Sequence, residues 1–347
     1  MFSKNLKYYR LMSAMTMKEL AERINVSPMA VSNYENGKRK PDMKLLEQMA
    51  DVLNVRVSDF LAVRNDKLVF YHGEFRMNST LSLSQQEYVK ESVEEYFNRF
   101  MSIVEISGGA VLPDAPLAGV LHLTRNSESD AGSLRKHLNL AADGPIDDLI
   151  GILENKGILV YVCDIKNDKF FGINGYVNER PYIVVNKNMS PERTRSTIAH
   201  ELSHLMFKWP DDMKNSELED MATAISGAFL FPLTDAKREL GIRRNSIAKD
   251  MYLVAQEYGV SMFMLVKRAQ LLGIISKSSA QMFYVKAAKD GWRKNEPPRI
   301  DKEDPTLFKQ LVYRAINENE ISIQKGAELL RIPYNEIVTN CCFNEVN

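Results

Sequence analysis

Two histidines one helical turn apart, with a glutamate directly after the first, constrain this 347-residue chain more than any other feature. The segment reads His200-Glu201-Leu202-Ser203-His204. In an α-helix, side chains at positions i and i+4 project from the same side about 6 Å apart, which suits two nitrogen ligands of one tetrahedral Zn²⁺. The intervening Glu201 can hold and deprotonate a water beside such a metal. The motif therefore predicts a helix with His200 and His204 as zinc ligands and Glu201 as the catalytic base.

The flanking residues predict where this helix begins and which side it buries. Ser190-Pro191-Glu192 is an N-cap, a proline at the first helical position and an acidic first turn. The apolar positions of the helix form one stripe, and the two histidines lie roughly 160° to 180° from its centre. The stripe comprises Ile198, Leu202, Leu205 and Met206. The histidines are therefore not core residues of the stripe, although two solvated surface histidines remain the alternative interpretation.

A catalytic zinc needs a third protein ligand and an open position for water. Residues 217–232 predict a second helix with an acidic start, ended by Pro232. On this helix Glu219 shares a face with small residues that would allow a close approach to the histidine helix, namely Ala222, Thr223 and Ser226. We expect Glu219 to be the third ligand, with Asp220 as the second candidate and Glu217 as the third. A solvated acid in an acidic stretch is the alternative interpretation of Glu219.

The N-terminal residues 1–62 carry an independent pattern, in which short helical segments alternate with turn signals. Thr16 and Ser27 are predicted N-caps of consecutive helices, and Pro41-Asp42 begins a further one, so we expect a bundle of four or five helices. In a helix-turn-helix unit the second helix presents its first side chains to base edges. The residues expected at base edges are Pro28, Met29, Ser32 and Asn33. Those expected to contact phosphates are Lys38, Arg39 and Lys40.

The distribution of charge agrees with a local DNA-binding face. The whole chain has 45 basic and 45 acidic residues, so affinity for nucleic acid must come from a patch and not from the net field. Residues 1–62 contain ten Lys or Arg and seven Asp or Glu, which gives this segment a net charge of +3. A helical adaptor that binds no DNA is the alternative interpretation.

The same segment resembles the Xre-like helix-turn-helix family of phage-repressor type, from Leu6 to about Leu61. The most specific part is Ser-x-x-x-Val-Ser-x-Tyr-Glu-Asn-Gly-Lys-x-x-Pro, residues 27–41. The resemblance implies that the chain binds operator DNA as a homodimer. Met17 stands where the family often has a phosphate-contacting Gln, and Pro28 stands where it often has a base-reading residue. These departures imply that Met29 and Asn33 carry the readout.

Residues from about 147 to 232 resemble the ImmA/IrrE family of zinc metallopeptidase domains. The resemblance rests on residues 180–186, on residues 193–204, and on Glu219-x-x-Ala222-x-x-Ile225-Ser226-x-x-Phe229-Leu230-x-Pro232. It implies an HExxH helix with a downstream Glu ligand, and a peptidase that cleaves helix-turn-helix repressors. Many members follow an Xre-like domain, as here. Met221-Ala222-Thr223 replaces a frequent Glu-Ala-Asn, so the resemblance supports the two histidines more than Glu219.

The remaining pattern predicts a mainly α fold with a small β-sheet (α+β) in four segments. These are the DNA-binding domain (1–62), a linker with an amphipathic helix (63–106), the zincin-like metallopeptidase domain (107–275) and a helical extension (276–347). Within them we expect a loop-rich stretch at 107–145 and strands at 158–163, 170–173 and 182–186. We expect the strand at 182–186 to form a sheet edge on which a peptide substrate can lie.

A weak internal similarity links the two ends of the chain. The segment that starts at Thr16 and continues through Val26-Ser27 is echoed by the segment that starts at Ser322 and continues through Ile332-Pro333. Each reads as a capped helix, a tight turn and a second helix, which is the shape of a helix-turn-helix corner. For the C-terminal copy, two helices packed at an angle inside a core are the preferred interpretation.

These observations leave two main functional hypotheses. The first is a DNA-binding regulator with an active zinc endopeptidase that cleaves a repressor or its own chain. The second is a repressor or antitoxin-like regulator whose metal domain senses or binds a partner without proteolysis, and a zinc-stabilised structural domain is a third. Three cysteines without CxxC spacing (Cys163, Cys341 and Cys342) and the lack of a long apolar stretch favour a cytoplasmic chain without membrane contact.

Overall fold

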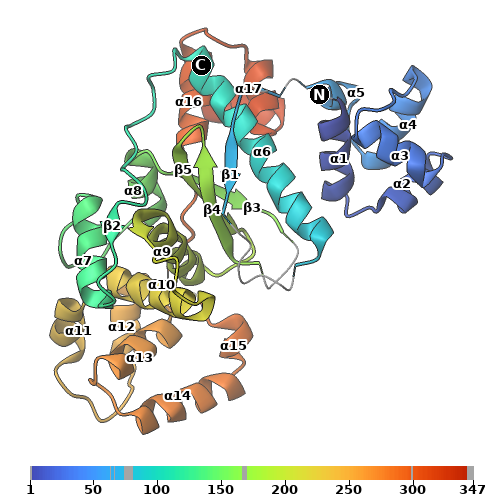
Figure 1. The fold of residues 1–347 in the computed structure, drawn as a ribbon. Helices are drawn as coiled ribbons and strands as arrows, with labels where there is room; N and C mark the ends of the chain where they lie inside the picture. Colours follow the sequence, from blue (N-terminus) through green and yellow to red (C-terminus); the bar gives the residue numbers. More distant parts are fainter. Residues whose placement is uncertain are drawn as a thin grey trace. The chain divides into compact units, whose positions relative to one another are not determined.

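The computed structural model describes residues 2–62, 64–65, 67–73, 81–165, 170–297 and 300–341 (Figure 1). The chain divides into two compact units. The first contains Met1–Phe70, Met77–Gly109 and Leu311–Asn347, and the second contains Tyr71–Arg76 and Ala110–Gln310. Positions 63, 66 and 74–80 of the predicted linker, and Cys342, lie outside the described residues. The division into four segments stays a prediction.

The first unit begins with a bundle of five short helices, here called the reader bundle. They are α1 (Phe2–Met12), α2 (Met17–Arg23), α3 (Pro28–Glu35), α4 (Met43–Leu53) and α5 (Val57–Leu61). The side chains of Thr16, Ser27 and Asp42 accept hydrogen bonds from backbone N–H groups in the first turns of α2, α3 and α4. These caps satisfy donors that a helix start leaves unpaired, which is why such short helices can begin at defined residues. The bundle closes over a shared apolar core that includes Leu6, Leu20, Val31, Met49 and Phe60.

Among the described residues, four helices from later in the chain complete the first unit. The amphipathic helix predicted within residues 63–106 is α6 (Leu83–Ile106), and it buries Val89, Val93, Phe97, Phe100 and Val104. The C-terminal helices are α16 (Leu307–Asn317), which belongs to this unit from Leu311 onward, α17 (Ile323–Leu330) and α18 (Tyr334–Cys341). Both α1 and α17 pack against α6.

The second unit contains a four-stranded mixed sheet in the order β1-β4-β5-β3. Its strands are β1 (Phe70–His72), β3 (Leu159–Cys163), β4 (Gly172–Val177) and β5 (Arg180–Asn186). Strand β5 pairs in parallel with β3 and antiparallel with β4. The prediction that residues 182–186 form a free sheet edge is therefore wrong, because both sides of this strand already have hydrogen-bonded neighbours. A separate parallel pair joins β2 (Leu121–His122) to β6 (Phe207–Lys208).

The helices of the second unit cover this sheet and extend beyond it (Figure 1). They are α7 (Ser127–His137), α8 (Leu149–Asn155), α9 (Pro191–Met206), α10 (Asn215–Leu230), α11 (Leu233–Leu240), α12 (Asp250–Glu257), α13 (Met262–Leu271), α14 (Lys277–Lys289) and α15 (Trp292–Asn295). Helix α9 packs against β4 and β5, and α10 packs against α9 and α7. The predicted loop-rich stretch at 107–145 is wrong where α7 forms. Helix α7 buries Asp130 and Arg135 beside its apolar residues, which hides the usual hydrophobic periodicity.

Two buried arginines hold the C-terminal end of α10. Arg135 is 1% exposed and donates to the carbonyl oxygen of Phe229 at 2.8 Å. Arg268 donates to the carbonyl oxygen of Phe231 at 2.8 Å and also pairs with Glu128 at 2.7 Å. A helix leaves its last carbonyl groups without partners inside the helix. These guanidinium groups supply partners and so fix where α10 ends.

The architecture is mainly helical with a small mixed sheet, which confirms the α+β prediction. Among the described residues, no helix is both long and apolar enough to cross a membrane.

Candidate metal centre and DNA-reading face

Helix α9 presents His200 and His204 on the side turned away from its apolar stripe. The Ser190 side chain caps the first turn and Pro191 occupies the first helical position, as the sequence predicts. The stripe residues Ile198, Leu202, Leu205 and Met206 are at most 1% exposed. On the face of α9 that carries Thr197 and Glu201, a Cβ at Gly172 would lie 2.8 Å from Thr197 Cγ2 and 3.3 Å from Glu201 Cγ. The absence of a side chain at Gly172 thus lets β4 approach the face of α9 that carries Glu201.

The structure brings the two histidines and Glu219 together in one cluster, here called the metal cluster. One ligand atom from each of the three residues lies within 4.8 Å of the others. His200 Nε2 lies 3.0 Å from His204 Nε2 and 3.2 Å from Glu219 Oε2, and His204 Nε2 lies 3.6 Å from Glu219 Oε1. Tetrahedral Zn²⁺ with bonds of about 2.0–2.1 Å places its ligand atoms about 3.4 Å apart. The donor set and its spacing therefore fit a zinc ion.

The small residues of α10 explain how Glu219 reaches the histidines. Ala222 is fully buried and Ser226 is 4% exposed, so the face that carries Glu219 packs closely. The Glu219 side chain itself is 20% exposed. Asp220 and Glu217 are exposed and are not part of the metal cluster. Of the three acids considered from the sequence, Glu219 is the one that the structure places beside the histidines.

Glu201 has a neighbour that the sequence analysis did not identify. The Asn174 side-chain amide on β4 donates a hydrogen bond of 2.7 Å to Glu201 Oε2. The same residue accepts a backbone hydrogen bond from Gly73 at 2.7 Å through its carbonyl oxygen. Burial raises the pKa of the Glu201 carboxyl, while the positive charge of His200 and the Asn174 hydrogen bond act in the opposite direction. Asn174 therefore fixes one carboxylate oxygen of Glu201, Oε2.

Other side chains surround the histidine rings. Burial disfavours the charged form of His200, but its hydrogen bond to Glu219 and the nearby Glu201 charge raise its pKa overall. The Thr223 hydroxyl lies 3.4 Å from His200 Nδ1, the ring nitrogen opposite the metal cluster. The Trp209 ring lies 5.5 Å from that of His204. Neither contact could be predicted, because each depends on how α10 and the segment after α9 fold back onto α9.

The predicted DNA-reading residues lie on or beside α2 and α3 in the reader bundle. Met17 is 40% exposed and Met29 is 68% exposed. Pro28 is exposed, Ser32 and Asn33 are half-buried, and the basic run at 38–40 is fully on the surface. From the opposite side, Val31 and Tyr34 anchor α3 in the apolar core. The exposed side chains of α3 are thus available to a groove of DNA, which is the arrangement that a helix-turn-helix requires.

A buried ion pair fixes α3 to α1. Arg10 donates two hydrogen bonds to the carboxylate of Glu35, at 2.5 and 2.9 Å, and a third to the carbonyl oxygen of Met15. The side chains of Arg10 and Glu35 are each only 5% exposed. The pair sets the position of the C-terminal end of α3 and was not identified from the sequence.

Fold and site together define a protein class: a helix-turn-helix domain joined to a metallopeptidase-like domain. Residues 6–60 match the helix-turn-helix family, and residues 153–270 match the IrrE N-terminal-like domain, a peptidase family. The chain belongs to the helix-turn-helix transcriptional regulators of Xre type and carries an IrrE/ImmA-like domain, which confirms the fusion predicted from the sequence.

Two curated relatives share the N-terminal part. The uncharacterised HTH-type transcriptional regulator YqaE of Bacillus subtilis is 33% identical over 70 residues, which span 20% of this chain and 60% of that protein. The uncharacterised HTH-type transcriptional regulator MJ0272 of Methanocaldococcus jannaschii is 32% identical over 62 residues, which span 18% of this chain and 94% of that protein. Both similarities support DNA binding and transcription regulation.

Proposed function

We propose that the chain is a transcriptional regulator whose second unit is a zinc-dependent endopeptidase acting on a protein substrate, such as a helix-turn-helix repressor or a copy of this chain. The convergence of His200, His204 and Glu219 around one point, with Glu201 beside it, is the observation that carries the proposal. Operator DNA is the proposed partner of the reader bundle, which we expect to bind as a homodimer.

In this proposal each residue around the metal cluster has a defined task. His200, His204 and Glu219 would hold Zn²⁺, which when bound would supply a Lewis acid for a peptide carbonyl and lower the pKa of water toward neutral pH. Glu201 accepts the proton of the attacking water at Oε1 and later delivers it to the leaving amine. Asn174 orients that carboxylate through its bond to Oε2. The distribution of tasks is that of a hydrolase, whereas a purely structural zinc site has four protein ligands and no free base.

The proposed ligand set predicts the metal content of variants. Protein purified without chelator is expected to hold one zinc per chain by native mass spectrometry. Replacing His204 or Glu219 by Ala removes a ligand and is expected to weaken zinc binding by more than about 100-fold, since the loss of outer-sphere partners alone costs 10–100-fold. Asp220→Ala and Glu217→Ala are the matched controls and keep the metal. Zinc retained by Glu219→Ala, or lost in Asp220→Ala, would contradict the assignment.

The basic run after α3 predicts how DNA binding depends on salt. Replacing Lys38, Arg39 and Lys40 by Ala removes three expected phosphate contacts, and each contact contributes about 0.9 to the slope of log affinity against log salt concentration. The triple variant is expected to bind the promoter of its own gene more weakly and with a slope smaller by about 2.7. Footprinting at several salt concentrations measures both quantities. Lys136→Ala, at an exposed position of α7, is the control, and an unchanged slope in the triple variant would rule out these contacts.

A further inference from the structure

The C-terminal segment 322–341 reproduces the backbone of the reader's helix-turn-helix and is here called the C-terminal corner. In both copies the second helix begins eleven residues after the first, at Met17 and Pro28 in one and at Ile323 and Tyr334 in the other. Ser322 caps α17 as Thr16 caps α2. The agreement in length and capping shows that the weak sequence echo corresponds to a shared backbone arrangement.

The turn between the two helices and the buried residue of the second helix also correspond in the C-terminal corner and the reader's helix-turn-helix. Nine residues after each cap the chain adopts a left-handed conformation, with φ of 55° at both Asn25 and Arg331. The fourth residue of each second helix is fully buried, Val31 in the reader and Ile337 in the C-terminal corner. Asparagine tolerates the left-handed region, whereas arginine adopts it less readily. Arg331 therefore occupies a position where its backbone is unfavourable, so contacts of its side chain are expected to compensate.

The C-terminal corner lacks the excess of basic side chains that binding to DNA phosphates requires. Its two basic residues, Lys325 and Arg331, are balanced by Glu328 and Glu336. Glu336 is exposed at the third position of α18, where a carboxylate would repel phosphate. Residues 342–347, directly after α18, contain no Lys or Arg, in contrast with the three basic residues at 38–40 that follow α3. Because phosphate contacts supply most of the affinity for DNA, this corner is not a second DNA reader.

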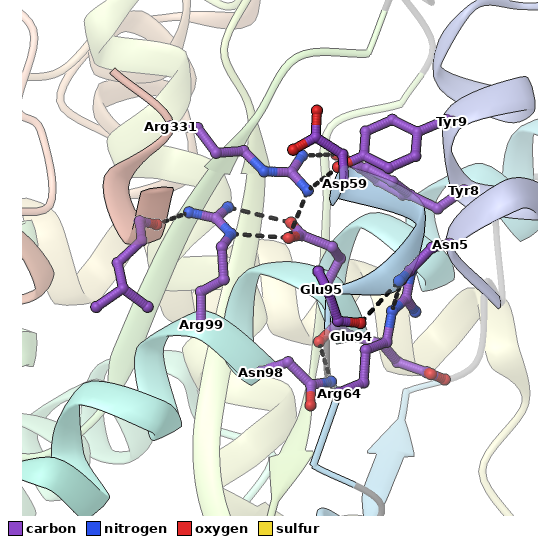
Figure 2. A network of polar contacts seen from close by, with 12 residues as sticks. Asn5, Tyr8, Tyr9, Asp59, Arg64, Glu94, Glu95, Asn98, Arg99 and Arg331 are labelled. Carbon is purple, nitrogen blue, oxygen red and sulfur yellow. Dashed lines mark hydrogen bonds and ion pairs between the residues drawn. The ribbon is translucent and has the colours of Figure 1, made fainter. Parts of the chain in front are cut away.

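Arg331 contacts the reader bundle and α6 at the same time (Figure 2). Its guanidinium donates hydrogen bonds to the Tyr8 hydroxyl at 2.8 Å, to the Tyr9 hydroxyl at 3.0 Å and to Glu95 at 2.6 Å. It also lies 5.0 Å from the centre of the Tyr8 ring and 5.4 Å from that of Tyr9. Burial raises the pKa of Tyr8, and raises that of Tyr9 to about 12, so both phenols stay neutral and accept these bonds.

A second arginine completes the connection. Arg99 on α6 donates to both carboxylate oxygens of Glu95, at 2.8 and 3.1 Å, and to the carbonyl oxygen of Leu329 near the end of α17 (Figure 2). Glu95 is thus shared by two guanidinium groups, one from α6 and one from the turn of the C-terminal corner. Charge-assisted hydrogen bonds of this kind are roughly twice as strong as neutral ones.

The attachment of the C-terminal corner to the reader bundle is polar. The apolar core of the bundle includes Tyr88 of α6 among the residues packed against it, but no described residue of the C-terminal corner. A groove of about 1350 Å³, lined by α1, α5, α6 and the C-terminal corner, runs beside Arg331 and Tyr9. A contact that rests on a few hydrogen bonds next to an open groove can separate without exposing an apolar core.

We propose that the C-terminal corner is a helix-turn-helix that binds protein in place of DNA, and that its partner is the reader bundle of the same chain, held through Arg331. The corner attaches to α1, on which Tyr8 and Tyr9 lie next to Arg10, the residue that positions α3. The contact thereby connects the end of the chain to the helix that supports the DNA-reading face.

Hydrogen exchange of the full chain, followed by mass spectrometry, tests this proposal. The double variant Tyr8→Phe/Tyr9→Phe removes the two acceptors that the reader bundle offers to Arg331, but keeps the rings, the Glu95 contact and the C-terminal corner unchanged. It is expected to accelerate exchange in residues 322–341 by about tenfold, because the corner loses two bonds to a charged group. Arg331→Asn is expected to give a similar acceleration, since Asn suits the left-handed turn and lacks the guanidinium.

The controls separate docking from stability of the corner itself. Tyr34→Phe, a buried tyrosine elsewhere in the bundle, and Arg314→Ala, an exposed residue of α16, are expected to leave exchange in residues 322–341 at the wild-type rate. Wild-type exchange in the Tyr8→Phe/Tyr9→Phe variant would overturn the proposal. This holds even if Arg331→Asn accelerates exchange, because Arg331 would then act within its own turn or through Glu95 of α6 and not through the reader bundle.

Discussion

Glu201→Gln is expected to lower the rate of peptide cleavage by about 10²- to 10⁴-fold, the usual contribution of a positioned general base. Glutamine has nearly the same shape but cannot take up the proton that Glu201 Oε1 would accept. Its amide oxygen can still receive the hydrogen bond from Asn174, so the local fold and the metal cluster are expected to remain. The variant therefore separates chemistry from metal binding.

A proteome-derived peptide library, digested by the zinc-loaded protein and read by mass spectrometry, measures the effect across many peptide sequences at once. Glu217→Gln is the matched control, because this acid is exposed on α10 and lies outside the metal cluster. Equal cleavage by the wild type and Glu201→Gln would exclude the proposed mechanism. Zinc binding without any cleavage by the wild type would favour a domain that senses or binds a partner.

Glu35→Ala is expected to destabilise the reader bundle by about 3–5 kcal/mol, because it leaves the buried Arg10 charge without its partner. This is a large part of the roughly 5–15 kcal/mol that stabilises a typical domain. We expect DNA binding to be lost at the same time, since α3 carries the reading side chains and ends at Glu35. Replacing both partners, as Arg10→Met with Glu35→Leu, is expected to restore most of the stability, because no charge then remains buried.

Hydrogen exchange of residues 2–61 within the full chain reports the stability of the bundle separately from the second unit. Glu47→Ala on α4 is the control, because Glu47 is exposed and its loss leaves no buried charge. A change of less than about 1 kcal/mol in the free energy of unfolding for Glu35→Ala would contradict this prediction, because an exposed ion pair contributes no more than that.

Local patterns predicted the parts of this structure that depend on neighbours in sequence. The i, i+4 spacing of His200 and His204 is sufficient to place both rings on one side of α9, independently of how the helix packs against the rest of the chain. The caps at Thr16, Ser27 and Ser190 predicted the starts of their helices for the same reason. Glu219 could be ranked first because its neighbours on α10 are small, although only the packing of α10 on α9 decides whether it reaches the histidines.

The features that were missed depend on contacts between distant segments. Asn174 meets Glu201 only because β4 pairs with β5 and passes over α9, and nothing in its sequence neighbourhood indicates this. Whether β5 is central or at an edge depends on which strand pairs with it on each side, a choice that its own residues leave open. Helix α7 was missed because it buries Arg135, whose partner is the carbonyl oxygen of Phe229 on α10, and Asp130, which accepts a hydrogen bond from nearby Thr124.

Arg135 and Arg268 hold the end of the helix that carries Glu219. They hold the carbonyl oxygens of Phe229 and Phe231, whereas Glu219 lies ten residues earlier on the same rigid helix, about 15 Å away. A helix held at one end transmits small axial shifts along its whole length. If the proposed zinc site is correct, substitutions at Arg135 or Arg268 are expected to alter the reach of the Glu219 carboxylate, and with it the affinity for zinc, while each proposed ligand stays chemically intact.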